Sequence, residues 1–175
     1  VQAAEKIYAD FTLTARNRGG HSSVPRPDNA IYELVDALTR VAHYEFPVQL
    51  NEVSRTFFER TAALETADVA AAMRAIVANP GDSAATAVLA RDPRYNSMLR
   101  TTCVATRLSG GHAYNALPQT ATANINCRIV PTSNPREARD VLVRIVADTG
   151  VHVTETYALG ERGDPVPSPL TPEIM

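Results

Sequence analysis

A Gly-Gly-His-Ser-Ser segment at residues 19–23 brings together residue types that suit a chemical site. Paired glycines let the backbone turn sharply or approach a ligand closely, and an imidazole can donate or shuttle a proton near neutral pH. The segment therefore predicts a presented functional side chain, His21. The alternative from these residues alone is a glycine turn that carries a surface histidine.

A second glycine pair begins residues 110–118, which have the sequence Gly-Gly-His-Ala-Tyr-Asn-Ala-Leu-Pro. Asn115 precedes Pro118 in this segment, and Arg128 follows thirteen positions after Asn115. Taken singly, Asn115 suits a turn before a proline and Arg128 suits an exposed strand end.

The composition is that of an ordinary folded domain. The 175 residues are 45% hydrophobic and 21% charged, which is enough to bury a normal core. The formal net charge of -2 recruits neither nucleic acid nor an anionic membrane, so neither is expected as a partner. The chain begins at Val1 rather than methionine and ends in a proline-rich segment, so we interpret it as an excised piece of a longer protein.

Hydrophobic periodicity divides most of the chain into strands and helices. Residues 5–16 alternate between apolar and polar positions, which predicts a half-buried strand whose buried face carries Ile7, Ala9, Phe11, Leu13 and Ala15. Apolar residues at helical spacing between 31 and 41 predict a helix capped by Asp28. Later strands are expected at 100–108, 120–130 and 151–157, with a helix that begins after Asn134 and is ended by Gly150.

The order of these elements predicts an α+β fold. Two helices would lie on one face of a four-stranded antiparallel sheet, in the ferredoxin-like split β-α-β arrangement. An alanine-rich helical insertion is expected at about residues 51–98, with Phe57 and Phe58 filling its core. Cys103 and Cys127 each lie in an expected strand, where buried free thiols are expected and a single bridge between neighbouring strands is the alternative.

These motifs, in this order and on these elements, resemble the dimerisation or lid domain of the M20 family of zinc metallopeptidases. The likeness rests on residues 19–23 between a strand and a helix, on Asn-Ala-Leu-Pro at 115–118, and on Arg128. It covers roughly residues 5–158, and the long insertion resembles the carboxypeptidase S or glutamate carboxypeptidase-like branch. The resemblance implies one lid domain over residues 1–175, with 159–175 as a linker back to a catalytic domain.

The resemblance also implies roles for the candidate residues. His21 would hydrogen-bond the scissile carbonyl oxygen in the active site of a partner subunit, while Asn115 and Arg128 would grip a substrate carboxylate. The substrate would be a small peptide or an N-acyl amino acid, and two zinc ions would belong to the catalytic domain of the same full-length chain. This chain alone would hold no cofactor and be inactive. A homodimer is expected through the lid, along the strand at 5–16 and the helix at 29–42.

A stand-alone ferredoxin-like module that binds a small ligand or regulates another protein, without catalysis, is the alternative. The four histidines, His21, His43, His112 and His152, lack the paired spacing of metal ligands, so no metal site is predicted in this chain. His-x-Asp and Glu-Glu metal motifs in the flanking sequence would favour the peptidase over the module.

Overall fold

The computed structural model describes residues 5–156 and residue 171. In chain order the elements are β1 (Ile7–Arg16), β2 (Gly20–His21), α1 (Ala30–His43), α2 (Glu52–Thr61), α3 (Ala67–Ala78), α4 (Ser83–Leu89), α5 (Pro93–Leu99), β3 (Thr102–Gly110), β4 (Ala116–Leu117), β5 (Thr120–Ile129), α6 (Pro135–Val146) and β6 (Val151–Glu155). The predicted linker at 159–175 lies outside the described residues, apart from residue 171. Within the described part of the chain, no helix is long and apolar enough to cross a bilayer.

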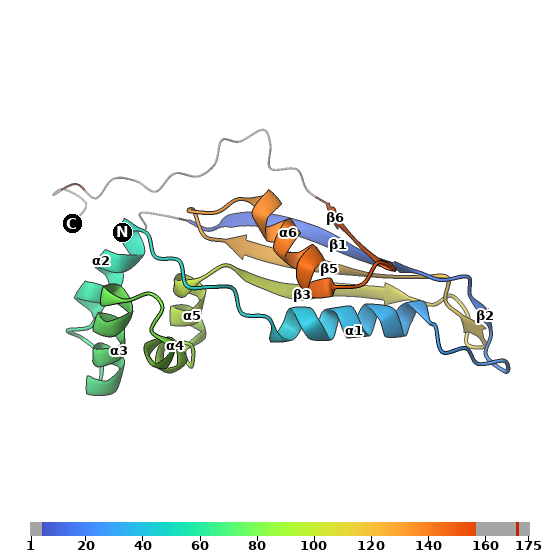
Figure 1. The fold of residues 1–175 in the computed structure, drawn as a ribbon, viewed down its shortest axis with the longest axis horizontal. Helices are drawn as coiled ribbons and strands as arrows, with labels where there is room; N and C mark the ends of the chain where they lie inside the picture. The colour runs from blue at the N-terminus through green and yellow to red at the C-terminus, as the bar shows by residue number, and fades with distance from the viewer. Residues whose placement is uncertain (1–4, 157–170, 172–175) are drawn as a thin grey trace.

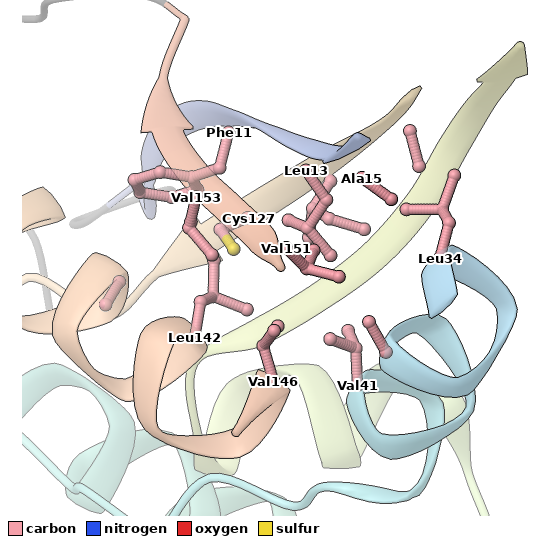
Figure 2. Packing of buried hydrophobic residues seen from close by; sticks show 14 of the residues in the cluster. Phe11, Leu13, Ala15, Leu34, Val41, Cys127, Leu142, Val146, Val151 and Val153 are labelled. Atoms are coloured by element: carbon pink, nitrogen blue, oxygen red, sulfur yellow. The ribbon is translucent and has the colours of Figure 1, made fainter. Parts of the chain in front are cut away.

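The main sheet has four antiparallel strands in the order β3-β5-β1-β6, with α1 and α6 on one face (Figure 1). This is the predicted ferredoxin-like arrangement. Alternate residues of β1 from Ile7 to Ala15 are buried under the helices, as the period of two requires. Figure 2 shows three of them, Phe11, Leu13 and Ala15, in the core with Leu34 and Val41 of α1 and Leu142 and Val146 of α6. The other face of the sheet carries mainly polar side chains, among them Asp10, Asn124 and Asn126.

The position of β1 corrects one expectation from the sequence. β1 is hydrogen-bonded to β5 along Ile7–Arg16 and to β6 along Phe11–Ala15, so it is an inner strand of the sheet and offers no edge to a second chain over Phe11–Ala15. The alternation of side chains shows which face of a strand is buried, but it does not show whether the strand lies in the middle of the sheet or at its edge. The edges of this sheet are β3 and β6.

The caps of the two sheet-covering helices were only partly predicted. Asn29, not Asp28, caps α1, because its side-chain oxygen accepts a hydrogen bond from the Ile31 N–H at 2.8 Å. Asp28 instead accepts hydrogen bonds from Arg26 and from Asn17. The Asp28 prediction was therefore wrong by one residue.

The helix α6 begins as predicted and ends earlier than predicted. Asn134 caps it through the Glu137 N–H at 3.0 Å, with Pro135 in the first turn. The helix ends at Val146, and Ala147 takes the left-handed conformation with φ of 48°. Gly150 does not end the helix and instead donates its N–H to Asp148 in the following turn.

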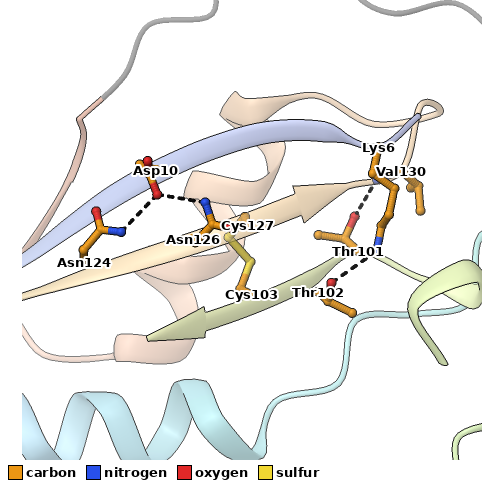
Figure 3. Close-up of a disulfide and its surroundings, with 9 residues drawn as sticks. All are labelled: Lys6, Asp10, Thr101, Thr102, Cys103, Asn124, Asn126, Cys127 and Val130. Carbon is orange, nitrogen blue, oxygen red and sulfur yellow. Dashed lines mark hydrogen bonds between the residues drawn. A yellow bond between two sulfur atoms is a disulfide. The ribbon is translucent and has the colours of Figure 1, made fainter. Parts of the chain in front are cut away.

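Cys103 and Cys127 form a disulfide, so the expectation of free thiols was wrong. The two residues lie directly opposite each other on β3 and β5 (Figure 3). Directly opposed residues of an antiparallel pair have their Cβ atoms close enough for a bridge. The sequence predicted that both residues lie in strands, but it did not predict the register of the two strands. That register decides whether the two cysteines face each other.

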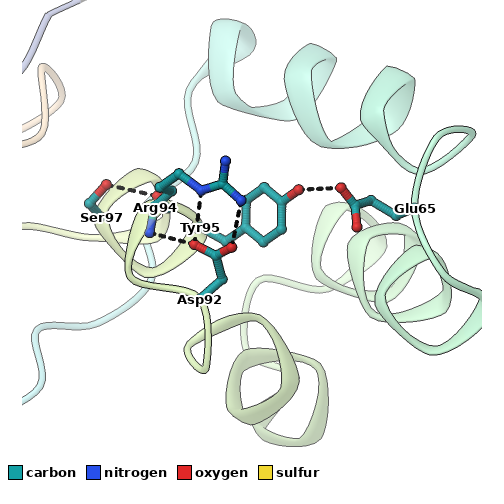
Figure 4. A network of polar contacts seen from close by, with 5 residues as sticks. All are labelled: Glu65, Asp92, Arg94, Tyr95 and Ser97. Carbon is teal, nitrogen blue, oxygen red and sulfur yellow. Dashed lines mark hydrogen bonds and ion pairs between the residues drawn. The ribbon is translucent and has the colours of Figure 1, made fainter.

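The segment between α1 and β3 holds the helices α2 to α5, which build a second hydrophobic core. Phe58 is fully buried there, and its ring and that of Phe57 both contact Tyr95. The phenol of Tyr95 donates to Glu65, while Arg94 pairs with Asp92 beside it (Figure 4). The aromatic pair therefore packs the core of these helices, as predicted.

Candidate functional site

His21 and Asn115 lie side by side at one tip of the molecule. The short strand β2 pairs with β4, so that His21 stands opposite Ala116, and the Ser22 N–H donates to the Asn115 carbonyl at 2.9 Å. The Nε2 atom of His21 is 3.4 Å from the Asn115 side-chain amide, and both residues are exposed. Two segments far apart in the sequence thus bring both predicted site residues together.

Gly19 makes this tip possible. Its φ of +71° lies in the left-handed region, which side chains disfavour. A Cβ atom at this position would lie 2.8 Å from Cγ of Gln119 and 3.0 Å from the Leu117 carbonyl oxygen. The glycine therefore lets the end of β1 cross close to the segment between β4 and β5, and the chain delivers His21 beside Asn115.

The neighbours of the His21 ring decide which nitrogen carries its proton. The backbone N–H of Ser23 donates to Nδ1 at 3.2 Å, and the Ser23 hydroxyl lies 2.8 Å from the same atom. A nitrogen that accepts from an N–H holds no proton in the neutral ring, so the proton sits on Nε2. The Asn115 atom nearest Nε2 is the side-chain nitrogen Nδ2, at 3.4 Å. Because Nδ2 is itself a donor, it does not accept from Nε2–H in this tautomer, and both groups remain exposed donors for a ligand.

Arg128 lies at the opposite end of the main sheet. It stands opposite Tyr8 on β1 and Thr102 on β3, whereas the tip adjoins the Thr120 end of β5. At about 3.3 Å per residue, the length of β5 between Thr120 and Arg128 is roughly 26 Å. The structure therefore brings His21 and Asn115 together in one chain and does not bring Arg128 to them.

Two residues that the sequence analysis did not single out support Arg128. Its guanidinium lies over the Tyr8 ring at 4.8 Å from the ring centre, and the Tyr8 hydroxyl donates to Asp10. Asp10 also accepts from Asn124 at 3.0 Å and from Asn126 at 2.9 Å. The alternation of β1 had placed Tyr8 and Asp10 on the polar face, which was the available signal.

Burial, hydrogen bonds and the charge of Arg128 shift the pKa values of two nearby groups. Burial acts to raise the pKa of Asp10, but hydrogen bonds from Asn126, Tyr8 and Asn124 outweigh it and hold the pKa below its ordinary value. Burial lowers the pKa of Lys6 to about 8, and the positive charge of Arg128 adds to this shift. Lys6 donates to the Thr102 hydroxyl at 3.2 Å (Figure 3) and also to the Ser97 carbonyl at 2.8 Å.

The described residues do not group metal ligands. No cluster of three or more His, Cys, Asp or Glu side chains occurs among them. His43 lies in the last turn of α1 and contacts the Thr39 carbonyl, while His112 and His152 are exposed on a loop and on β6. A zinc ion would therefore find no set of ligands in this part of the chain.

Comparison with known proteins gives a family-level match. The family model described as "Peptidase dimerisation domain" matches residues 3–154. The chain is 27% identical over 157 residues to a probable carboxypeptidase S-like protein of Dictyostelium discoideum, covering 89% of this chain and 29% of the relative. It is also 27% identical over 161 residues to an N-fatty-acyl-amino acid synthase/hydrolase of Mus musculus, covering 90% and 31%. The chain thus spans under a third of the length of these relatives.

Solved structures support the fold. An M20 family metallo-carboxypeptidase from Sulfolobus solfataricus matches with a TM-score of 0.50 and 17% identity, over 86% of this chain and 43% of that one. Human carnosine dipeptidase 1 matches with a TM-score of 0.50 and 13% identity, over 88% and 38%. At these identities the likeness concerns the arrangement of helices and strands.

Proposed function

Because the chain belongs to the M20 peptidase dimerisation domain family, we propose that it is the lid of a dinuclear-zinc metallopeptidase that hydrolyses peptide or N-acyl amino acid amide bonds. The observation that carries the proposal is the exposed pair His21 and Asn115 at the tip, next to one another and far from Arg128. An exposed histidine at such a tip could donate a hydrogen bond into the active site of another subunit.

The Nε2–H of His21 would act on the scissile carbonyl. As a water molecule attacks this carbonyl, negative charge builds on its oxygen, and a hydrogen-bond donor stabilises that charge more in the transition state than in the ground state. The Ser23 N–H, by occupying Nδ1, keeps the donor on the outward nitrogen. Asn115 adds a second donor next to the ring, and its backbone carbonyl holds the His21 segment through the Ser22 N–H.

Arg128 would bind a substrate carboxylate, because a guanidinium offers parallel donors that match the two oxygens. Since Asn115 and Arg128 lie at opposite ends of the sheet, one chain cannot close both residues on one small substrate. We therefore assign each site to two copies of the chain. His21 and Asn115 come from one copy and Arg128 from the other, which also holds the catalytic domain.

The two zinc ions are assigned to the catalytic domain and not to this lid. The described residues offer no set of ligands that fits them, so the side chains of the lid would bind and polarise the substrate without holding metal. The 175-residue chain alone is expected to release no product from peptides or N-acyl amino acids. Elemental analysis that finds about one tightly held zinc per chain would contradict this assignment.

A mixing experiment with the full-length enzyme tests the shared site. The His21→Ala and Arg128→Ala homodimers should each be nearly inactive, since every site lacks one group. After equal mixing and subunit exchange, half of the dimers are heterodimers with one intact site of two, so about a quarter of the wild-type activity should return. Activity that stays at the level of the parents would show that both residues serve the same chain. Mixing His21→Ala with Asn115→Ala is the control and should restore nothing.

A further inference from the structure

A cavity of about 760 Å³ lies between the helical segment and the connection from α1 to α2. Its wall is formed by residues 45–48, the turn between α3 and α4, one side of α4, and Arg100 just before β3. This volume is within the range of small-molecule sites. The apolar part of the lining consists of Phe46, Pro47, Val48, Pro80, Ala87 and Ala90.

Arg100 brings a buried charge to this apolar cavity. Its side chain is 5% exposed, and Nη1 donates to Oε2 of Glu45 at 2.7 Å. Nε and Nη2 are buried and have no hydrogen-bond partner among the described residues. A buried donor without a partner costs free energy, and here two such donors lie on one side chain. A ligand that accepted from both would remove this cost.

The two unpaired donors belong to the same edge of the guanidinium. Nε–H and one N–H of Nη2 point in parallel along that edge, which matches the two oxygens of a carboxylate. Glu45 occupies only Nη1 and is 72% exposed in its side chain, so the Nε and Nη2 edge is covered by other protein atoms and is not paired with Glu45. We propose that the cavity binds an aliphatic carboxylate, toward whose head group the Arg100 side chain turns Nε and Nη2, while the chain of the ligand lies against the apolar wall.

The α4 segment and the α1–α2 connection, which line the cavity, lie at the end of the molecule away from β2, which carries His21 (Figure 1). At that end, the Gln49 N–H donates to the Leu99 carbonyl at 2.8 Å, and Lys6 reaches the Ser97 carbonyl. A bound carboxylate would join α4, the α1–α2 connection and the start of β3 through one side chain. It would not touch His21 of the same chain.

Calorimetric titration of the full-length protein with octanoate tests the proposal. Octanoate should bind. Octan-1-ol has a chain of the same length without the charge, and its dissociation constant should be at least about tenfold higher than that of octanoate. Arg100→Lys keeps the positive charge but lacks the parallel donors, so it should weaken octanoate binding by a similar factor. Ala87→Phe should also abolish most of the binding, because Ala87 is an exposed lining residue whose enlargement fills the cavity without disturbing the core.

Arg74→Gln is the matched control, because Arg74 is an exposed arginine of α3 that does not line the cavity. It should bind octanoate like the wild type. Ala87→Phe keeps the test decisive if Arg100→Lys fails to fold, which circular dichroism would reveal. Unchanged octanoate affinity in a folded Ala87→Phe variant, or equal affinity for octanoate and octan-1-ol, would overturn the proposal.

Discussion

The guanidinium carbon of Arg128 lies 4.8 Å from the centre of the Tyr8 ring, on the face of the sheet that the helices leave uncovered. The two residues stand opposite each other on β5 and β1. The Tyr8 ring gives the guanidinium a flat support, and Asp10 holds the Tyr8 hydroxyl in turn. The chain therefore fixes the orientation of the side chain to which we assign the substrate carboxylate.

Removing this support should weaken binding of carboxylate substrates. In the full-length enzyme, Tyr8→Leu should raise KM roughly twofold to fivefold with little change in kcat, the range expected for an exposed cation–π contact. Tyr8→Phe keeps the ring and should behave much like the wild type. Steady-state kinetics on an N-acyl amino acid measure both values. If the Leu and Phe variants were equally impaired, the hydroxyl and not the ring would support Arg128.

Truncating His21 should affect turnover more than binding. His21→Ala removes a donor to developing charge, and loss of one such donor lowers kcat on the order of a hundredfold to a thousandfold. Asn115→Ala, which leaves the ring in place, should have a smaller effect on kcat. A His21→Ala enzyme with near-normal kcat and a raised KM would identify His21 as a positioning residue.

Lys6 should make stability depend on pH in the alkaline range. Its pKa is about 8 in the folded chain and 10.5 ordinarily. Between these values the unfolded chain binds more protons at this residue, so the free energy of unfolding should rise as the pH is raised from 8 toward 10. Urea unfolding of the wild type and of Lys6→Met across this range measures the effect. The difference between the two proteins should shift in favour of the wild type as pH rises, and a constant difference would contradict the prediction.

The sequence predicted those features that depend on neighbours along the chain. The alternation of β1 and the Asn134-Pro135 start of α6 are local patterns, and both were confirmed. The Cys103–Cys127 bridge and the central position of β1 depend on which strands pair and in what register. Pairing is a non-local property that a single strand pattern does not encode.

Some residues of the candidate site could likewise be predicted from local sequence, and others could not. His21 and Asn115 stood out because glycines and a proline mark their segments, and the structure places them together. Their separation from Arg128 follows from the length and direction of β5, which the spacing of thirteen residues between Asn115 and Arg128 concealed. Arg100 gave no signal, because its burial depends on residues distant in the sequence, from the α1–α2 connection and the α3–α4 turn, that come together around the cavity it lines.

The disulfide should stabilise the edge of the sheet. It joins residues separated by 24 positions, and closure of a loop of this length is worth about 3 to 4 kcal/mol in the chain-entropy account. The Cys103→Ala, Cys127→Ala double variant should lose stability of this order in urea unfolding. Wild-type protein treated with a reducing agent is the control for packing and should lose nearly as much. Equal stability of oxidised and reduced wild type would contradict the prediction.

The dimer should form along β3 and α1 rather than along β1. Among the described residues β3 pairs only with β5, which leaves its other side a free edge, and its Leu108 is 66% exposed. Leu108 stands opposite the buried Ala123, so it projects toward the helix-bearing face, where α1 presents Ile31 and Val35. An exposed apolar patch beside a free strand edge suits a two-fold interface in which each chain offers the same surface.

Two valines of equal exposure test this interface. Val35 on α1 and Val143 on α6 are each 45% exposed, but only Val35 lies on the helix that packs beside β3. Val35→Glu should place a charge in the interface and give a monomer in sedimentation equilibrium at micromolar concentration, because an unpaired buried charge strongly opposes association. Val143→Glu should remain a dimer like the wild type. If Val143→Glu alone dissociated the dimer, the interface would lie on α6 and the edge strand β6, and if wild type were a monomer, His21 would have no partner site to reach.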